Sequence, residues 1–169
     1  FGSKPKLMEN VNPKLRAQVA EHQLDKLGYF NGKVDYEVLT QSNPKEAKVA
    51  YKVNMGHLWR LDSVAYLNFP EHGKQLIDST MSQAVIRKGS PFNVSNLEQE
   101  RQRLTRLFRN HGYYFYQNGY ASYLADTVNT PGKVNLRLSM VDSIEPEATR
   151  QWYIGNININ FKKQFIEEM

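Results

Sequence analysis

The stretch from Ser95 to Leu124, SNLEQERQRLTRLFRNHGYYFYQNGYASYL, decides the fold because its design occurs twice in the chain. It predicts a charged helix, a turn at Gly112 and a strand rich in tyrosine. At an offset of 84 residues, Gly28 occupies the place of Gly112, again between a helical pattern and a strand pattern. Internal repetition of this kind indicates a series of similar small modules.

Both copies continue into strands with alternating apolar residues, which is typical of half-buried strands. Trp59 and Trp152 mark a further correspondence, because they open similar apolar stretches at an offset of 93. These offsets predict modules of roughly 85 to 93 residues. The alternating residues are Ala47, Val49, Tyr51 and Val53 in the first copy and Val134, Leu136, Leu138 and Met140 in the second.

The first part of the chain predicts one helix and a strand hairpin. Asn12 is a good N-cap, Pro13 suits the first helical position, and Gly28 suits a left-handed C-cap. Alternation then predicts strands over residues 34–38 and 46–55.

The second part predicts a complete unit over about residues 58–141, in the order strand, helix, helix, strand, strand. Its first strand changes parity near Asp62, which a β-bulge would explain. A helix after Pro70 carries an apolar stripe as far as Val85 and is expected to end at Gly89. The unit therefore has two helices between its first and second strands.

The second of these helices is expected to begin at Ser95, because Ser95 and Glu98 have the spacing of a capping box. Its buried stripe and the two strands that follow are predicted as a group. The stripe comprises Leu97, Leu104, Leu107 and Phe108, and the strands cover residues 115–125 and 133–141.

Composition sets the broad class of the protein. The 169 residues include no cysteine, which excludes the disulfide-rich secreted class and thiolate chemistry. The net charge of +5 permits a polyanionic partner, but basic and acidic residues are interleaved, as on an ordinary solvated surface. No apolar run approaches the roughly 18 residues of a membrane-spanning helix. Because the chain starts without Met inside a repeat, we expect a piece of a longer protein.

The order of elements, together with several repeated motifs, resembles the POTRA (polypeptide-transport-associated) domain. The resemblance implies an α+β fold of tandem β-α-α-β-β modules, each a three-stranded mixed sheet with two helices packed on one face. It extends over nearly the whole chain. The motifs that carry it are Gly28-Tyr29-Phe30, Gly112-Tyr113-Tyr114-Phe115, the loop from Arg87 to Phe92, and the strand openings at Trp59 and Trp152.

The resemblance also implies a division of the chain into four parts. Residues 1–56 would be a partial module, with only its second helix and hairpin, and residues 57–142 a complete one. Residues 143–151 would be a linker. Residues 152–169 would begin a further module with its first strand.

Tandem POTRA modules resemble the periplasmic arm of the BamA and TamA superfamily of Gram-negative bacteria. This implies a non-enzymatic arm of an outer-membrane β-barrel assembly factor, continuous with a C-terminal membrane barrel. Its partners would be unfolded outer-membrane proteins or accessory assembly subunits. One alternative is the arm of a protein-secretion pore, and another is an RNA-binding αβ module, although no aromatic RNA-binding signature stands in the strands.

Catalytic and cofactor motifs are missing from the sequence, so we predict no catalytic, cofactor or metal site. The four histidines lack the spacing of metal ligands. Arg101, Arg103, Arg106 and Arg109 could face phosphates, but Glu98 and Glu100 stand three residues before Arg101 and Arg103. Such pairs favour an exposed, solvated helix face over a nucleic-acid site.

Two strand edges are the candidate binding sites. In a POTRA-like sheet the third strand is central, so the second strand has unpaired backbone groups that can accept an added strand. We therefore predict docking edges over residues 31–39 and 116–124, and we expect proline at Ser122 to weaken binding. For any single tyrosine ring, core or cross-strand packing is the favoured interpretation and a recognition surface the alternative. The candidate residues are Val34, Tyr36, Val38, Tyr116, Tyr120, Ser122 and Tyr123.

Overall fold

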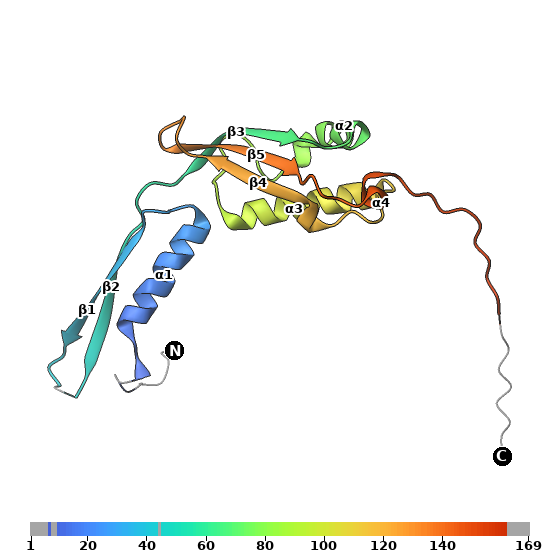
Figure 1. The fold of residues 1–169 in the computed structure, drawn as a ribbon. Coiled ribbons are helices and arrows are strands. Elements are labelled where there is room, and N and C mark those ends of the chain that lie inside the picture. The colour runs from blue at the N-terminus through green and yellow to red at the C-terminus, as the bar shows by residue number, and fades with distance from the viewer. Residues whose placement is uncertain (1–6, 8–9, 44, 162–169) are drawn as a thin grey trace, which may run out of the picture.

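The computed structural model describes residues 7, 10–43 and 45–161 of the chain. Its elements form two small sheets with helices beside them (Figure 1). In chain order they are α1 (Pro13–Leu27), β1 (Lys33–Thr40), β2 (Ala47–Asn54), β3 (Arg60–Leu67), α2 (Glu71–Ser79), the 3-10 helix η2 (Met81–Gln83), α3 (Val94–Asn110), the 3-10 helix η3 (Asn118–Tyr120), β4 (Ala121–Asp126), β5 (Lys133–Met140) and α4 (Pro146–Thr149).

The larger sheet has the strand order β3-β5-β4, with its last strand in the centre. β3 pairs with β5 in parallel and β4 pairs with β5 antiparallel, so the sheet is mixed. Residues of β5 share one core with α2 and α3, where Ile77, Leu104 and Leu138 are fully buried. The predicted β-α-α-β-β unit, with its central third strand, is confirmed.

The bulge predicted in the first strand is present. The register between β3 and β5 shifts between Leu61 and Ser63, so Asp62 is the extra residue. The bulge lets Leu61 and Tyr66 both face the core although they are an odd number of residues apart.

The smaller sheet is the hairpin of β1 and β2, which lies beside α1 (Figure 1). Asn12 accepts the N–H of Leu15, and Gly28 ends α1 with a φ of +97°, as the sequence predicted. Ala17, Leu24 and Val34 form a small core between helix and hairpin. Much of the hairpin's apolar surface is therefore left uncovered.

The first helix of the complete unit is shorter than predicted. It ends at Ser79 rather than extending through Val85, and a turn of 3-10 helix follows. Thr80 bonds through its hydroxyl to the carbonyl oxygens of the last turn, and Val85 donates its N–H to the carboxylate of Glu100. These partners replace the helical ones, so the backbone can leave the helix without losing hydrogen bonds.

The predicted capping box of α3 is wrong. Asn93 is the N-cap and accepts the N–H of Asn96, so the helix begins before Ser95. Glu98 instead contacts Arg101 and the amide of Asn118. Sequence patterns identified a capping signal here but misplaced it by two residues.

The second strand of the complete unit is also shorter than predicted, because it begins at Ala121 and not near residue 115. Tyr116 is only 1% exposed and packs on Phe108 with ring centroids 4.6 Å apart. Its carbonyl accepts from Arg109, and that of Asn118 accepts from Arg101. Core packing and these two arginines hold residues 116–120 out of the strand.

An ion pair lies in the core where the sequence indicated a solvated helix face. Glu100 is fully buried and binds Arg103, with nitrogen–oxygen distances of 2.6 to 3.1 Å. Glu100 also accepts from Tyr66 and Val85, and Arg103 donates to Thr80. The expectation that the Glu100–Arg103 pair is exposed is therefore wrong.

After β5 the chain forms the short helix α4, whose Ala148 is buried, within the predicted linker. Residues 152–161 form neither helix nor strand, and none of the strands in the described part of the chain pairs with them. The prediction that a further module begins at residue 152 also covers residues 162–169, which lie outside the described part of the chain. It stays a prediction.

Candidate docking site

The free edge of β4 is defined by which backbone groups face β5. Val141 donates its N–H to the carbonyl of Tyr120, so Tyr120 and Val141 form a hydrogen-bonded pair. Antiparallel pairs alternate, so the pairs of Ser122, Leu124 and Asp126 with β5 are also hydrogen-bonded. The alternate residues direct their N–H and C=O groups away from β5. These residues are Ala121, Tyr123 and Ala125.

In β1, as in β4, every second residue directs its backbone N–H and C=O groups away from the partner strand. Val34 donates its N–H to Glu21 of α1 at 3.0 Å, so this N–H points away from β2. By alternation, Tyr36 and Val38 also direct their backbone groups outward. At the β1 edge the carboxylate of Glu21 already accepts the outward N–H of Val34. At the β4 edge no described side chain bonds to the outward backbone groups of Ala121, Tyr123 or Ala125.

The seven candidate residues of the sequence fall into three groups. Val34, Tyr36, Val38 and Tyr123 lie on free edges with outward backbone groups, whereas Ser122 lies on β4 but faces β5. Tyr116 and Tyr120 precede β4 and belong to or contact the core. Ala121 lies within the predicted edge but was not among the candidate residues, and Ala125 lies just outside that edge. Strand parity would have indicated both had the start of β4 been known.

Side chains give the β4 edge two different faces. On the helix side, the hydroxyl of Tyr123 donates to the carbonyl of Leu97 at 2.6 Å, which ties the strand to α3. On the opposite face, Leu124 is 62% exposed and Val128 is 84% exposed, beside Arg137 in a hollow of about 360 Å³. An added strand would meet apolar side chains on this open face.

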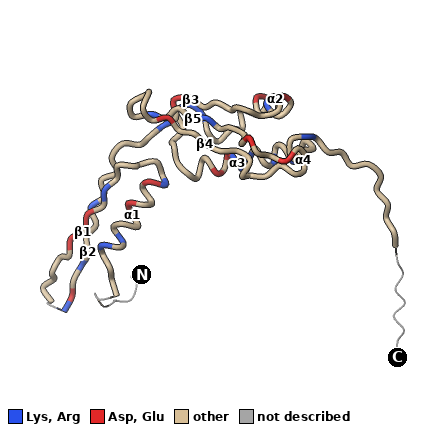
Figure 2. The backbone as a smooth tube through the Cα atoms, in the orientation of Figure 1, with Lys and Arg blue, Asp and Glu red and all other residues tan. Residues whose placement is uncertain are grey.

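Charge distinguishes the two edges (Figure 2). β1 has Lys33, Asp35 and Glu37 within eight residues, whereas β4 has only Asp126, at its end. Asn129 and the N–H of Val128 donate to Asp126 and keep the pKa of its carboxyl below the usual value. Charged side chains protect strand edges from pairing. The β4 edge is therefore the more receptive of the two.

Three tyrosines in or beside the core of this unit are held neutral by their surroundings. Burial raises the pKa of Tyr116 and, together with the charge of Glu100, the pKa of Tyr66 and Tyr123. Glu100 in turn raises the pKa of Arg103, although burial alone would lower it. The core behind β4 therefore holds uncharged tyrosines and one compensated ion pair.

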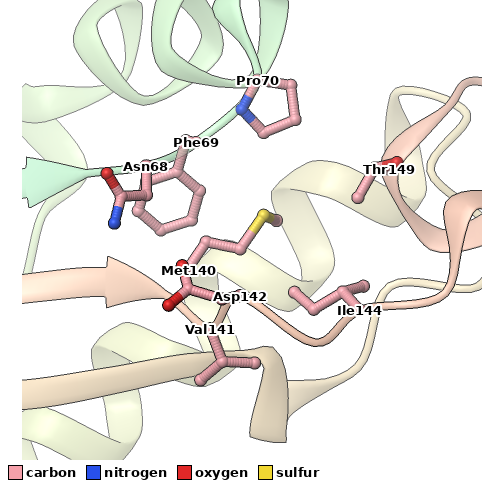
Figure 3. Close-up of a pocket in the computed structure, with 8 residues that line it drawn as sticks. All are labelled: Asn68, Phe69, Pro70, Met140, Val141, Asp142, Ile144 and Thr149. Carbon is pink, nitrogen blue, oxygen red and sulfur yellow. The ribbon is translucent and has the colours of Figure 1, made fainter.

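A hollow of about 410 Å³ lies where β3 and β5 end (Figure 3). Phe69 and Ile144 supply apolar walls, and two of its polar side chains already have partners: Asn68 donates to Ser139, and Thr149 donates to the carbonyl of Pro146. The lining has one carboxylate, Asp142, and no base beside a nucleophile. This arrangement offers no catalytic geometry.

Three of the four histidines occupy structural positions. His57 donates to the carbonyl of Gly132, His111 donates to the carbonyl of Leu107, and His72 contacts the hydroxyl of Tyr113. No group of three potential metal ligands occurs among the described residues.

The two Gly-Tyr motifs and the two tryptophans meet at two equivalent joints. At the first, Trp59 donates its N–H to the carbonyl of Gly28 at 3.1 Å. At the second, Trp152 donates to the carbonyl of Gly112 at 2.7 Å. The same repeated residues therefore make the same backbone contact twice, which neither motif predicts when considered alone.

Aromatic packing and close backbone approach complete each joint. Phe30 packs on the edge of Trp59, and Phe115 packs on the edge of Trp152, with centroids 6.5 and 5.3 Å apart. A Cβ on Gly28 would lie 2.5 Å from the carbonyl oxygen of Phe92. Glycine is required there both by this approach and by its positive φ.

Comparisons with known proteins give structural likenesses only. No family model and no curated protein matches the chain. The chain is similar to Haemophilus influenzae BamA POTRA3-5 (14% identity, TM-score 0.45), covering 85% of this chain and 54% of that one. It is similar to Haemophilus ducreyi BamA lacking POTRA domains 1-3 (21% identity, TM-score 0.42), covering 83% and 27%.

A third likeness is to the N-terminal domain of Omp85 from Thermosynechococcus elongatus (18% identity, TM-score 0.38), covering 83% of this chain and 55% of that one. The chain spans about half the length of these proteins or less. All of these solved structures are of BamA or Omp85 proteins. In the described part of the chain no helix is long and apolar enough to cross a membrane.

Proposed function

We propose that this chain is part of a non-enzymatic, periplasmic POTRA arm of an outer-membrane β-barrel assembly factor. Its β4 edge, and less readily its β1 edge, binds segments of unfolded barrel proteins or accessory subunits by strand addition. In the whole protein a C-terminal membrane barrel would follow the arm. The single observation that carries the proposal is the free, nearly uncharged edge of β4. β1 has a free edge whose backbone groups alternate in the same way.

Strand addition suits clients that have little sequence in common. The free N–H and C=O groups of Ala121, Tyr123 and Ala125 would bind any extended backbone, so affinity does not depend on client sequence. The open face near Leu124 would select apolar residues at alternate positions of the added strand. Barrel strands have this alternation.

The decisive variant is Ala125→Pro, tested with a peptide of alternating apolar and polar residues taken from a barrel strand. Proline removes the outward N–H of Ala125 without breaking a bond to β5, and edge strands tolerate proline at such positions. Loss of one main-chain bond and of close approach should weaken peptide binding about tenfold. Binding is measured by fluorescence anisotropy and folding by circular dichroism.

Ala125→Val is the matched control, because it keeps the N–H and retains a strand-forming side chain. It should bind the peptide as the unmodified chain does. Equal binding by Ala125→Pro would refute docking at this edge. Ser122→Pro, which the sequence suggested as a test, is unsuitable because Ser122 faces β5 and proline there would break the sheet.

A further inference from the structure

Three of the four arginines of α3 have partners within the fold. Arg101 and Arg109 donate to backbone carbonyls of the segment that follows the helix. Arg103 binds the buried carboxylate of Glu100. Arg106 is the exception, because it is exposed and its guanidinium neither donates to nor pairs with any residue in the described part of the chain. Its charge is therefore available to a ligand.

The helix itself does not compensate the charge of Arg106. Residues three and four positions apart are neighbours on a helix surface. For Arg106 these neighbours are Gln102, Arg103, Arg109 and Asn110, and none of them is acidic. Both acidic residues of α3 lie nearer to its N-terminus. Two of the four neighbours add further positive charge.

Arg106 lines a hollow of about 400 Å³ between α3 and the segment that follows α2. None of the described residues that line this hollow is acidic. Arg103 also lines it, but the charge of Arg103 is balanced by Glu100, which is fully buried and is not part of the lining. The hollow therefore has one uncompensated positive charge, on Arg106.

Hydrogen-bond donors without partners surround this charge. The side-chain amides of Gln83 and Asn110 line the hollow and bond to no described residue, and each amide nitrogen can donate two hydrogen bonds. Arg103 is only 9% exposed and is fixed by bonds to Glu100 and to the hydroxyl of Thr80. These bonds use one N–H of each terminal nitrogen of Arg103, so a second N–H remains on each.

A carboxylate matches this hollow better than a phosphate does. The planar guanidinium group binds a carboxylate through two parallel hydrogen bonds. A carboxylate has one negative charge, which Arg106 balances, whereas a phosphate group has about −1.5 to −2 at neutral pH. Leu107 adds an apolar wall that the methylene groups of a glutamate side chain can contact. Glutamate is therefore the best-matched side chain.

The joints between modules leave this face of the helix open. At an offset of 84, three lining residues of the hollow correspond to His22, Lys26 and Leu27 of α1. A complete module follows α1, and these three residues are nevertheless exposed. Because both joints make the same Gly–Trp contact, a module that follows at the second joint would leave the hollow open in the same way.

We propose that the hollow at Arg106 is a binding site for a glutamate carboxylate that a protein partner presents. Arg106 pairs with the carboxylate, and the amides of Gln83 and Asn110 donate to it. The contact uses side chains of α3 and of the segment after α2, so it does not depend on strand addition at β4.

The test is a titration of the 169-residue chain with N-acetyl-glutamate N-methylamide at constant pH and ionic strength. NMR signals of the Arg106 guanidinium and of the Asn110 side-chain amide report binding, and we expect both to shift and to saturate. The corresponding glutamine compound has nearly the same shape without the charge and should shift neither signal. Inorganic phosphate should bind more weakly than the glutamate compound.

Arg106→Gln should weaken binding of the glutamate compound about tenfold, because it removes a charge-assisted pair of hydrogen bonds. Arg106 is exposed and has no described partner, so the circular dichroism spectrum should be unchanged. The matched control is Arg87→Gln, which removes the same charge from another exposed arginine and should leave binding unchanged.

Two results would overturn the site itself. One is a titration without saturable shifts, or with equal shifts from the glutamine compound. The other is equal weakening by Arg106→Gln and Arg87→Gln, which would indicate general attraction of anions to a basic protein. Tighter binding of phosphate than of the glutamate compound would refute the assignment of the ligand as a carboxylate.

Discussion

Removing the buried carboxylate of Glu100 should strongly destabilise the complete unit. In Glu100→Ala the residue Arg103, which is 9% exposed, loses its only acidic partner among the described residues. The N–H of Val85 and the hydroxyl of Tyr66 lose their acceptor. An uncompensated buried charge costs about 3–5 kcal/mol, and orphaned donors add to this. We therefore expect a loss of about 5 kcal/mol.

That loss is comparable with the whole stability of such a unit, which is about 4–13 kcal/mol at this size. Urea unfolding followed by circular dichroism measures it as a lower midpoint or as an unfolded population without urea. The control is Asp78→Ala, which removes the solvent-exposed pair with Lys74 and should cost under about 1 kcal/mol.

A double variant separates charge from packing. Glu100→Leu combined with Arg103→Met removes both charges and should restore the part of the stability that the uncompensated charge costs, because buried ion pairs can be replaced by apolar residues of similar volume. The N–H of Val85 and the hydroxyl of Tyr66 still lack their acceptor in this variant, so the rest of the loss should remain. If Glu100→Ala were no more destabilising than Asp78→Ala, the conclusion that this pair holds α3, β3 and the segment after α2 together would be refuted.

Two further predictions concern the joint and alkaline pH. Gly28→Ala should loosen the first joint, because the added Cβ would meet the carbonyl of Phe92. Small-angle scattering would detect this as a broader distance distribution. The control is Gly89→Ala, where φ is also positive but the space around the added Cβ is open, so the joint should be unchanged. Tyr66, Tyr116 and Tyr123 have raised pKa values when folded, so their contribution to stability is complete below about pH 10 and decreases above it by up to about 1.4 kcal/mol per pH unit for each tyrosine. Urea midpoints at neutral and alkaline pH measure this, and a midpoint independent of alkaline pH would contradict it.

The repeat predicted the architecture well because its signals are local. Alternation located β5 at residues 133–140, and the parity change in the first strand located the bulge after Leu61. The cap residues Asn12 and Gly28 bounded α1 correctly, since both act through hydrogen bonds within one turn.

The errors arise where distant residues compete with local preference. The apolar residues that follow Pro70 have helical spacing as far as Val85, but Glu100 of α3 accepts the backbone N–H of Val85. Tyr116 has strand-forming neighbours, yet packing on Phe108 takes it into the core. Tertiary contacts of this kind are not encoded in the spacing of nearby residues, and the start of β4 depended on them.

The equivalence of the two joints has a geometric consequence. If each module passes the chain to the next through the same Gly–Trp contact, then one rotation and one translation relate every neighbouring pair. Repeating a single such operation generates a screw path, as in solenoid proteins. A change of a few degrees at one glycine, copied along the series, would alter the pitch of the whole series of modules while leaving each module unchanged.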